Sequence, residues 1–153
     1  YVAQRWLDGR GTLYDDLWVS RPQAIFLAYG AVMRTIGGGV VELRIGAWVV
    51  SALTLLVVWR FAAAWGGPRL ARLATLLFAV IASSPAVEGF TANAEVFMAL
   101  PAAGCAVLLL TASRTGWRAG HLLAIGVLAA LATQLKPSGI VMLPVAVAFL
   151  WLA

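Results

Sequence analysis

Long hydrophobic runs alternate with short polar segments along this chain, and the apolar runs dominate after residue 44. We expect about five of these runs to be helices that cross a membrane, at residues 45–65, 70–87, 95–112, 119–135 and 138–153. Gly66-Gly67-Pro68 is expected to end the first run, and Pro85 is expected to break the second. The pattern predicts an all-α integral membrane bundle.

Residues 1–44 have a different pattern, with Trp and Tyr side chains placed among charged residues. Such segments favour the headgroup region of a membrane, so we expect an outer-face loop with interfacial helices. One helix is expected to start with Ser20 as its N-cap and to end at Gly37-Gly38-Gly39. Its uncharged run, residues 22–33, is too short to cross a hydrocarbon core of about 30 Å.

Composition agrees with this pattern. The chain is 63% hydrophobic and 11% charged, whereas soluble domains average roughly 45 to 50% apolar and 25% charged residues. Its net charge is +5, but the basic residues separate apolar runs and form no patch that could follow a nucleic acid backbone. We therefore expect membrane lipids and not nucleic acid as partners. The single Cys105 lies in an apolar run and is expected to be a small buried side chain.

Charged residues also predict an orientation. Two connections between the apolar runs carry arginines without acids, and we place both in the cytoplasm: Arg60, Arg69 and Arg72 in one, Arg114 and Arg118 in the other. All the acids then lie on the opposite, extracytoplasmic side: Asp8, Asp15, Asp16, Glu42, Glu88 and Glu95. Because acids contribute little to orientation, this one-sided distribution predicts a polar site on the outer face of a plasma membrane.

Several runs resemble the bacterial glycosyltransferases of the GT-C fold that use polyprenyl-phosphate sugars. They are YVAQRWLDGRGTLYDDLWVSRPQAIFLAYG, ELRIGAWVVSAL, TANAEVFMALPAAG and ATQLKPSGIVMLP, and they occur in the family's order along the whole chain. The resemblance is closest to the relatives of dolichyl-phosphate-mannose protein mannosyltransferases and to aminoarabinose and galacturonic acid transferases. It implies a polytopic enzyme whose acceptor is a lipid, glycan or protein.

One family motif is a tyrosine, an aspartate two residues later, an aromatic residue and then Lys-Pro-Pro. The matching residues here are Tyr14, Asp16, Trp18, Arg21 and Pro22. This chain has Arg21 where the family usually has Lys, and Gln23 where it has the second Pro; Arg keeps the charge and adds a bidentate donor for phosphate. In the family an acidic pair precedes a tyrosine like Tyr1. We therefore expect this segment to belong to a longer protein that has Asp or Glu just upstream of Tyr1. Without that acid, we expect the segment to be inactive.

The resemblance implies a transfer in which a carboxylate takes a proton from the acceptor hydroxyl while the lipid phosphate leaves the sugar. The candidate catalytic residues are Asp15, Asp16 and Glu95, and the candidate donor phosphate ligands are Arg21 and Lys136. Glu95 is also a candidate ligand for a divalent cation.

Each of these residues has a simpler alternative. The aspartates can belong to a solvated loop, Arg21 can reach the interface by snorkelling, Lys136 can simply end a helix, and Glu95 can favour a helix dipole. A polytopic transporter or a non-catalytic membrane subunit also fits the apolar pattern, although a transporter should carry ionisable groups near mid-membrane.

Overall fold

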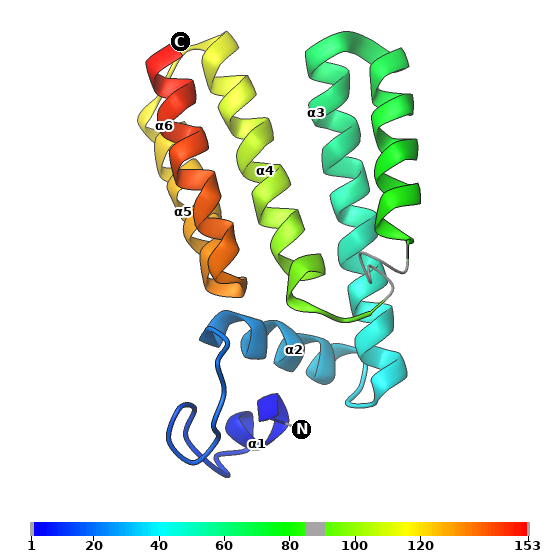
Figure 1. Ribbon diagram of the computed structural model, residues 1–153, viewed down its shortest axis with the longest axis vertical. Coiled ribbons are helices and arrows are strands. Elements are labelled where there is room, and N and C mark those ends of the chain that lie inside the picture. Colours follow the sequence, from blue (N-terminus) through cyan, green and yellow to red (C-terminus); the bar gives the residue numbers. More distant parts are fainter. Residues whose placement is uncertain (1, 85–90, 153) are drawn as a thin grey trace.

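The computed structural model describes residues 2–84 and 91–152, and Figure 1 shows their arrangement. Every element named in these ranges is a helix, as expected. The α-helices are α1 (Val2–Leu7), α2 (Gln23–Thr35), α3 (Val40–Ala82), α4 (Ala94–Thr115), α5 (Ala119–Leu135) and α6 (Met142–Leu152), and a 3-10 helix, η1 (Pro137–Val141), joins the last two.

Helix α3 is a hairpin of two limbs, residues 40–65 and 68–82, which run in opposite directions (Figure 1). The reversal occurs at Gly66 and Gly67, whose backbone angles are not helical. Gly67 has φ of 78°, in the left-handed region that glycine adopts without steric cost, and Pro68 then starts the second limb. The break expected at Gly66-Gly67-Pro68 is confirmed. The second limb ends at Ala82, and Pro85 lies outside the described residues.

Ser20 does not cap α2, contrary to the sequence prediction. The helix begins at Gln23, and Pro22 occupies the N-cap position with extended backbone angles and no side-chain cap. A residue that precedes proline is driven toward extended conformations, so Arg21 cannot extend the helix back toward Ser20. At its other end α2 stops at Thr35, just before the glycine run, as expected.

Helices α4, α5 and α6 pack together, and α2 lies across one end of this group with α1 beyond it (Figure 1). Two buried clusters hold the arrangement. One joins α1 and α2 to the start of α4 and the end of α5, and it includes Ile25, Phe26, Phe97 and Leu135. The other lies between α4, α5 and α6 around a fully buried Cys105. The first cluster fixes α2 against the ends of α4 and α5.

Of the helices in the described ranges, α3 and α4 are long and apolar enough to cross a membrane. Helix α5 and the η1–α6 segment are shorter apolar helices. The second limb of α3 exposes a row of large apolar side chains, including Leu73, Leu76, Leu77 and Val80. Exposed apolar surface of this extent is typical of a helix that contacts lipid or another apolar partner.

Candidate functional site

The described acids gather at one end of the helical group, which also carries basic residues such as Arg21, Arg34 and Lys136. Among the described acids, Asp8, Asp15, Asp16, Glu42 and Glu95 belong to elements at the end that carries α1 and α2 (Figure 1). Glu88 lies outside the described residues. At the other end, Arg114 donates hydrogen bonds to the carbonyl oxygens of Ala64 and Trp65, which the hairpin of α3 leaves open. The end with the acids therefore holds the candidate site.

Glu95 and Lys136 form an ion pair between two helix ends. Glu95 lies in the first turn of α4, and Lys136 is the C-cap of α5, 41 residues away along the chain. Asn93 fixes the start of α4, because its side-chain oxygen accepts a hydrogen bond from the Val96 amide at 3.2 Å. The side chains of Lys136 and Glu95 are 35% and 47% exposed, so a ligand can reach both.

Arg21 and Tyr29 lie close to this pair. The Tyr29 hydroxyl donates a hydrogen bond of 2.7 Å to the Ala92 carbonyl oxygen, and its ring meets Phe97 edge to face with centroids 5.5 Å apart. Burial raises the pKa of Tyr29; the charge of Arg21 lowers it, and that of Glu95 raises it. Arg21 also interacts electrostatically with Glu95. We call Arg21, Tyr29, Glu95 and Lys136 the Glu95 cluster.

The backbone of Arg21 is held by the segment that precedes it. The Tyr14 hydroxyl donates a hydrogen bond of 2.9 Å to the Arg21 carbonyl oxygen. Tyr14 itself has φ of 74°, a left-handed conformation that costs a non-glycine residue roughly 1 to 3 kcal/mol. A tight turn imposes it, since the Tyr14 amide donates to the Leu17 carbonyl and the Leu17 amide donates to that of Thr12. The tyrosine of the sequence motif thus fixes the start of the segment that carries Arg21.

Asp15 and Asp16 lie in this same turn and form no ion pair or hydrogen bond with the Glu95 cluster in the described structure. One carboxylate oxygen of Asp16 accepts hydrogen bonds of 2.9 Å from both the backbone amide and the hydroxyl of Thr12. These two bonds, the backbone one first, lower the pKa of Asp16. Asp15 is exposed beside it. Of the five candidate site residues, the structure therefore pairs Glu95 with Lys136 and places Arg21 within electrostatic range of Glu95.

Sequence reasoning missed Tyr29. The residue lies within the uncharged run of residues 22–33, in which the sequence analysis assigned no role to it. The available signal was its hydroxyl, which needs a hydrogen-bond partner when the ring is buried. That partner is the segment just before Glu95, so Tyr29 links α2 to the start of α4.

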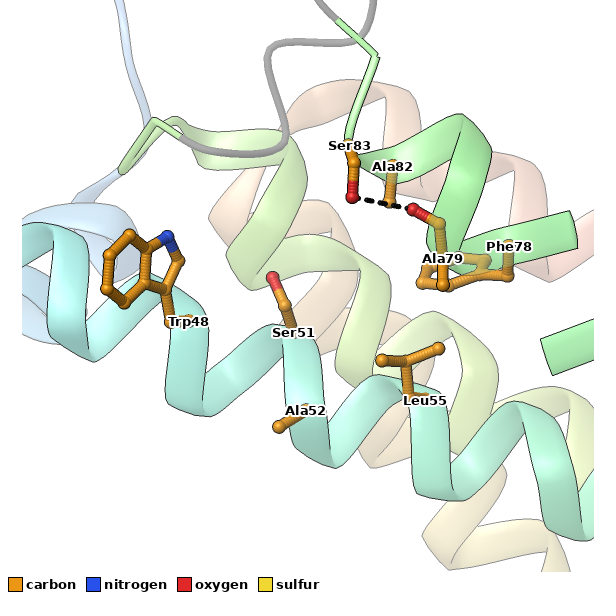
Figure 2. A pocket seen from close by; sticks show the side chains of 8 residues that line it. All are labelled: Trp48, Ser51, Ala52, Leu55, Phe78, Ala79, Ala82 and Ser83. Atoms are coloured by element: carbon orange, nitrogen blue, oxygen red, sulfur yellow. Dashed lines mark hydrogen bonds between the residues drawn. The ribbon is translucent and has the colours of Figure 1, made fainter. Parts of the chain in front are cut away.

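Two neighbouring apolar cavities lie along α3, and one of them reaches the Glu95 cluster. The first, of about 300 Å³, lies between the limbs of α3, where Figure 2 shows Trp48, Ser51 and Leu55 on one limb and Phe78 on the other. The second, of about 200 Å³, shares Ser51 and Phe78 with the first and reaches Glu95 and Val96 of α4. A largely apolar space therefore extends from the carboxylate of Glu95 into the α3 hairpin.

In the part of the chain that the structure describes, no group of three or more His, Cys, Asp or Glu side chains is placed to hold a metal ion. The carboxylate of Glu95 has Lys136 as its ion-pair partner, and an ammonium group in that position opposes a cation. The residues present around Glu95 do not fit a divalent cation, and we derive no step through one.

A scan against protein-family models and searches of curated proteins and of solved structures gave no match to this chain.

Proposed function

We propose that this chain is part of an integral membrane glycosyltransferase that moves a sugar from a polyprenyl-phosphate donor to an acceptor hydroxyl on the extracytoplasmic face of the plasma membrane. The observation that carries the proposal is the Glu95–Lys136 ion pair at one end of apolar helices, with Arg21 near enough for its charge to act on both Glu95 and Tyr29. Its support also includes the sequence resemblance to GT-C enzymes of this class.

The two cations suit the donor phosphate. Arg21 offers a planar fork of donors that matches phosphate oxygens, and Lys136 offers a compact ammonium group. In the structure Lys136 is paired with Glu95 and stays 35% exposed, so a phosphate can share the ammonium without a large rearrangement. As the sugar leaves, negative charge grows on the phosphate, and fixed cations stabilise that charge.

Glu95 suits the acceptor hydroxyl. Its ion pair with Lys136 favours the ionised carboxylate, which is the form that can accept a proton. When the donor phosphate draws Lys136 away, the carboxylate loses its partner and becomes a stronger base. Donor binding would in this way prepare the base for the acceptor. Asp15 and Asp16 remain candidates for contact with the acceptor from the neighbouring turn.

The adjoining cavities suit the apolar part of the donor. A prenyl chain needs an apolar path that starts close to the phosphate site, and the space between the limbs of α3 begins at Glu95 and is lined mainly by apolar side chains. Ser51 and Thr54 are the hydroxyl-bearing residues on the wall of the second cavity. This geometry favours a lipid-linked donor over a soluble nucleotide sugar.

A non-catalytic membrane subunit is the second candidate, and the ion pair itself is the observation that favours it. A contact between the start of α4 and the end of α5 can serve only to hold the two helices together. Half-exposed ion pairs of this kind contribute little to stability, typically 0 to 1 kcal/mol. A purely structural role therefore predicts a small effect when either charge is removed.

Substitution of Arg21 tests the proposal in the intact protein reconstituted with a polyprenyl-phosphate sugar. Arg21→Ala is expected to lower kcat/KM roughly 10²- to 10³-fold, as loss of other preorganised donors to a developing oxyanion does. Arg21→Lys should restore much of the loss, because it keeps the charge. Arg44→Ala is the matched control, since Arg44 is exposed in the first turns of α3 and outside the cluster. Wild-type turnover by Arg21→Ala, normalised to folded protein, would refute the assigned role.

A further inference from the structure

A separate polar pocket lies between α1 and α2. Its volume is about 270 Å³, and its wall includes Gln4 of α1, Asp8 just after that helix, Arg34 in the last turn of α2, and Gly38. None of these residues belongs to the Glu95 cluster. We call this cavity the α1–α2 pocket.

The pocket presents one acid and one base that do not neutralise each other. In the described ranges Asp8 and Arg34 form no ion pair, either together or with another residue, and both are exposed. Glu42 adds a second acid nearby, because its side chain lies against Gly37 and Gly39 on either side of Gly38. A ligand that carries separate positive and negative groups can therefore pair with Asp8 and with Arg34 at the same time.

The shape of the pocket is set by close packing. Gly30 is buried in α2, and a methyl group added there would overlap the side chain of Leu7 at the end of α1. After Leu7 the chain turns at Gly9, whose φ is 69°, and the Asp8 amide donates to the Gln4 carbonyl oxygen at 2.9 Å. The packing of Leu7 against Gly30 thus holds α1, with Gln4 and Asp8, beside α2.

Apolar surface begins directly beside the pocket. Gly38 lies two residues before Val40, and Val40 and Val41 at the start of α3 are 69% and 65% exposed. Ile36, just before the glycine run, is also exposed. A molecule that fills the pocket with a charged head can lay hydrocarbon chains along the first turns of α3.

We propose that the α1–α2 pocket binds the headgroup of a glycerophospholipid that carries a phosphate and a primary ammonium group. Arg34 takes the phosphate, Asp8 takes the ammonium with help from the side-chain amide of Gln4, and the acyl chains lie on Val40 and Val41. A volume of about 270 Å³ suits such a headgroup better than a drug-sized ligand. The inference rests on the membrane placement proposed above and is independent of sugar transfer.

The charges distinguish this headgroup from other common ones. Phosphatidylglycerol brings a phosphate but no cation, so Asp8 would face a net anion. Phosphatidylcholine has a cation without N–H donors, so it cannot donate a hydrogen bond to the carboxylate of Asp8. Phosphatidylethanolamine supplies both an anion for Arg34 and an N–H donor for Asp8.

Native mass spectrometry of the detergent-solubilised protein with equimolar phosphatidylethanolamine, phosphatidylcholine and phosphatidylglycerol tests this assignment. Wild type is expected to retain phosphatidylethanolamine about tenfold over phosphatidylglycerol, the effect of one charge-assisted hydrogen bond. Arg34→Gln should lose retention of all three lipids, whereas the control Arg44→Gln should keep the wild-type pattern. Asp8→Asn should keep binding but lose the preference for phosphatidylethanolamine over phosphatidylglycerol, which gives a readout even where Arg34→Gln fails to fold.

Equal retention of the three lipids by wild type would overturn the proposal, and so would an Asp8→Asn variant with unchanged preference. Free O-phosphoethanolamine, which has the headgroup but no acyl chains, is added as a soluble competitor. If it displaces the phospholipid at equal concentration, the site takes a soluble phosphate ester and the lipid assignment is wrong. None of these measurements follows sugar transfer. A negative result for lipid binding therefore says nothing against the proposed enzyme activity, and absence of that activity says nothing against lipid binding.

Discussion

Asp16 and Glu95 show how two carboxylates near the same end of the molecule acquire different roles. Asp16 accepts two hydrogen bonds from Thr12, four residues away, and so holds the turn that carries Tyr14. Glu95 meets Lys136 from a distant part of the chain and lies at the mouth of an apolar cavity. The first role is local and the second depends on the whole fold.

The pKa of Asp16 gives a prediction about pH. Because hydrogen bonds in the folded turn lower this pKa, their contribution to stability is complete above the ordinary pKa of an aspartate and is lost as pH falls through the lowered value. Carboxyl NMR of Thr12→Val should show the pKa of Asp16 moving up, but not fully to its ordinary value, since the backbone amide of Thr12 still donates.

Arg5→Gln is the comparison for this titration. The charge of Arg5 also lowers the pKa of Asp16, but it is the smallest of the causes. We expect a smaller upward movement than in Thr12→Val, and one that salt reduces. A larger effect from Arg5→Gln would mean that charge, and not the turn, controls this carboxyl group.

At the scale of elements, the junction of α5 and η1 places Lys136. The Lys136 amide donates to the Ala132 carbonyl and ends α5, and the Gly139 amide donates to the Lys136 carbonyl at 2.8 Å. Gly139 is buried, and a side chain there would meet the backbone of Ala132 and Thr133, which cannot move aside as a flexible side chain could. The close turn therefore requires glycine at position 139.

Two glycine substitutions test this junction. Gly139→Ala should lower the free energy of unfolding in mixed micelles by about 1 to 3 kcal/mol, the usual cost of overpacking. Gly126→Ala, in the exposed middle of α5 with open space around it, should be neutral or stabilising by about 0.5 to 1 kcal/mol. Equal stability of the two variants would show that η1 can move away from α5 at little cost.

Local signals in the sequence predicted some element boundaries and failed at others. Gly66-Gly67-Pro68 specifies a helix break by its own backbone preferences, so it was predictable without knowledge of the fold. The Ser20 prediction failed because the restriction that Pro22 imposes on Arg21 outweighs the capping preference of serine. The proline therefore decides where this helix starts, and the serine does not.

At the scale of the whole molecule, the described acids gather at the end that carries α1 and α2, and the arginines of the α3 hairpin and of the α4–α5 connection belong to the other end. If the apolar helices cross a membrane in the proposed orientation, Ser20 and Ser138 face outward and Thr115 faces the cytoplasm. All three are exposed at helix ends or in connections.

Single cysteines at these positions test the orientation. In a Cys105→Ala background, Ser20→Cys and Ser138→Cys should react with an impermeant thiol reagent added to intact cells, and Thr115→Cys should react only after the membrane is opened. Buried Cys105 in wild type is the negative control. Labelling of position 115 without positions 20 and 138 would invert the orientation and place the acids in the cytoplasm.

The helical class followed from composition and periodicity, whereas the candidate site followed only in part. Arg21, Glu95 and Lys136 could each be identified as a charge next to an apolar run, because a charge close to a membrane is costly unless it has a partner or a function. Their meeting could not be predicted, since it depends on how α2 lies across α4 and α5, which side-chain packing decides. Tyr29 was missed for the same reason: its partner lies 63 residues away.

The measurement that tests the central proposal most directly is a comparison of donor binding and sugar transfer in Glu95→Gln. This change removes the proposed base and releases Lys136 for the phosphate. Binding of a polyprenyl-phosphate sugar to the intact protein should therefore be retained or become tighter, while kcat falls by about 10²- to 10⁴-fold. Full turnover by Glu95→Gln, with the donor bound as in wild type, would contradict the account and leave the Glu95–Lys136 pair as a structural contact.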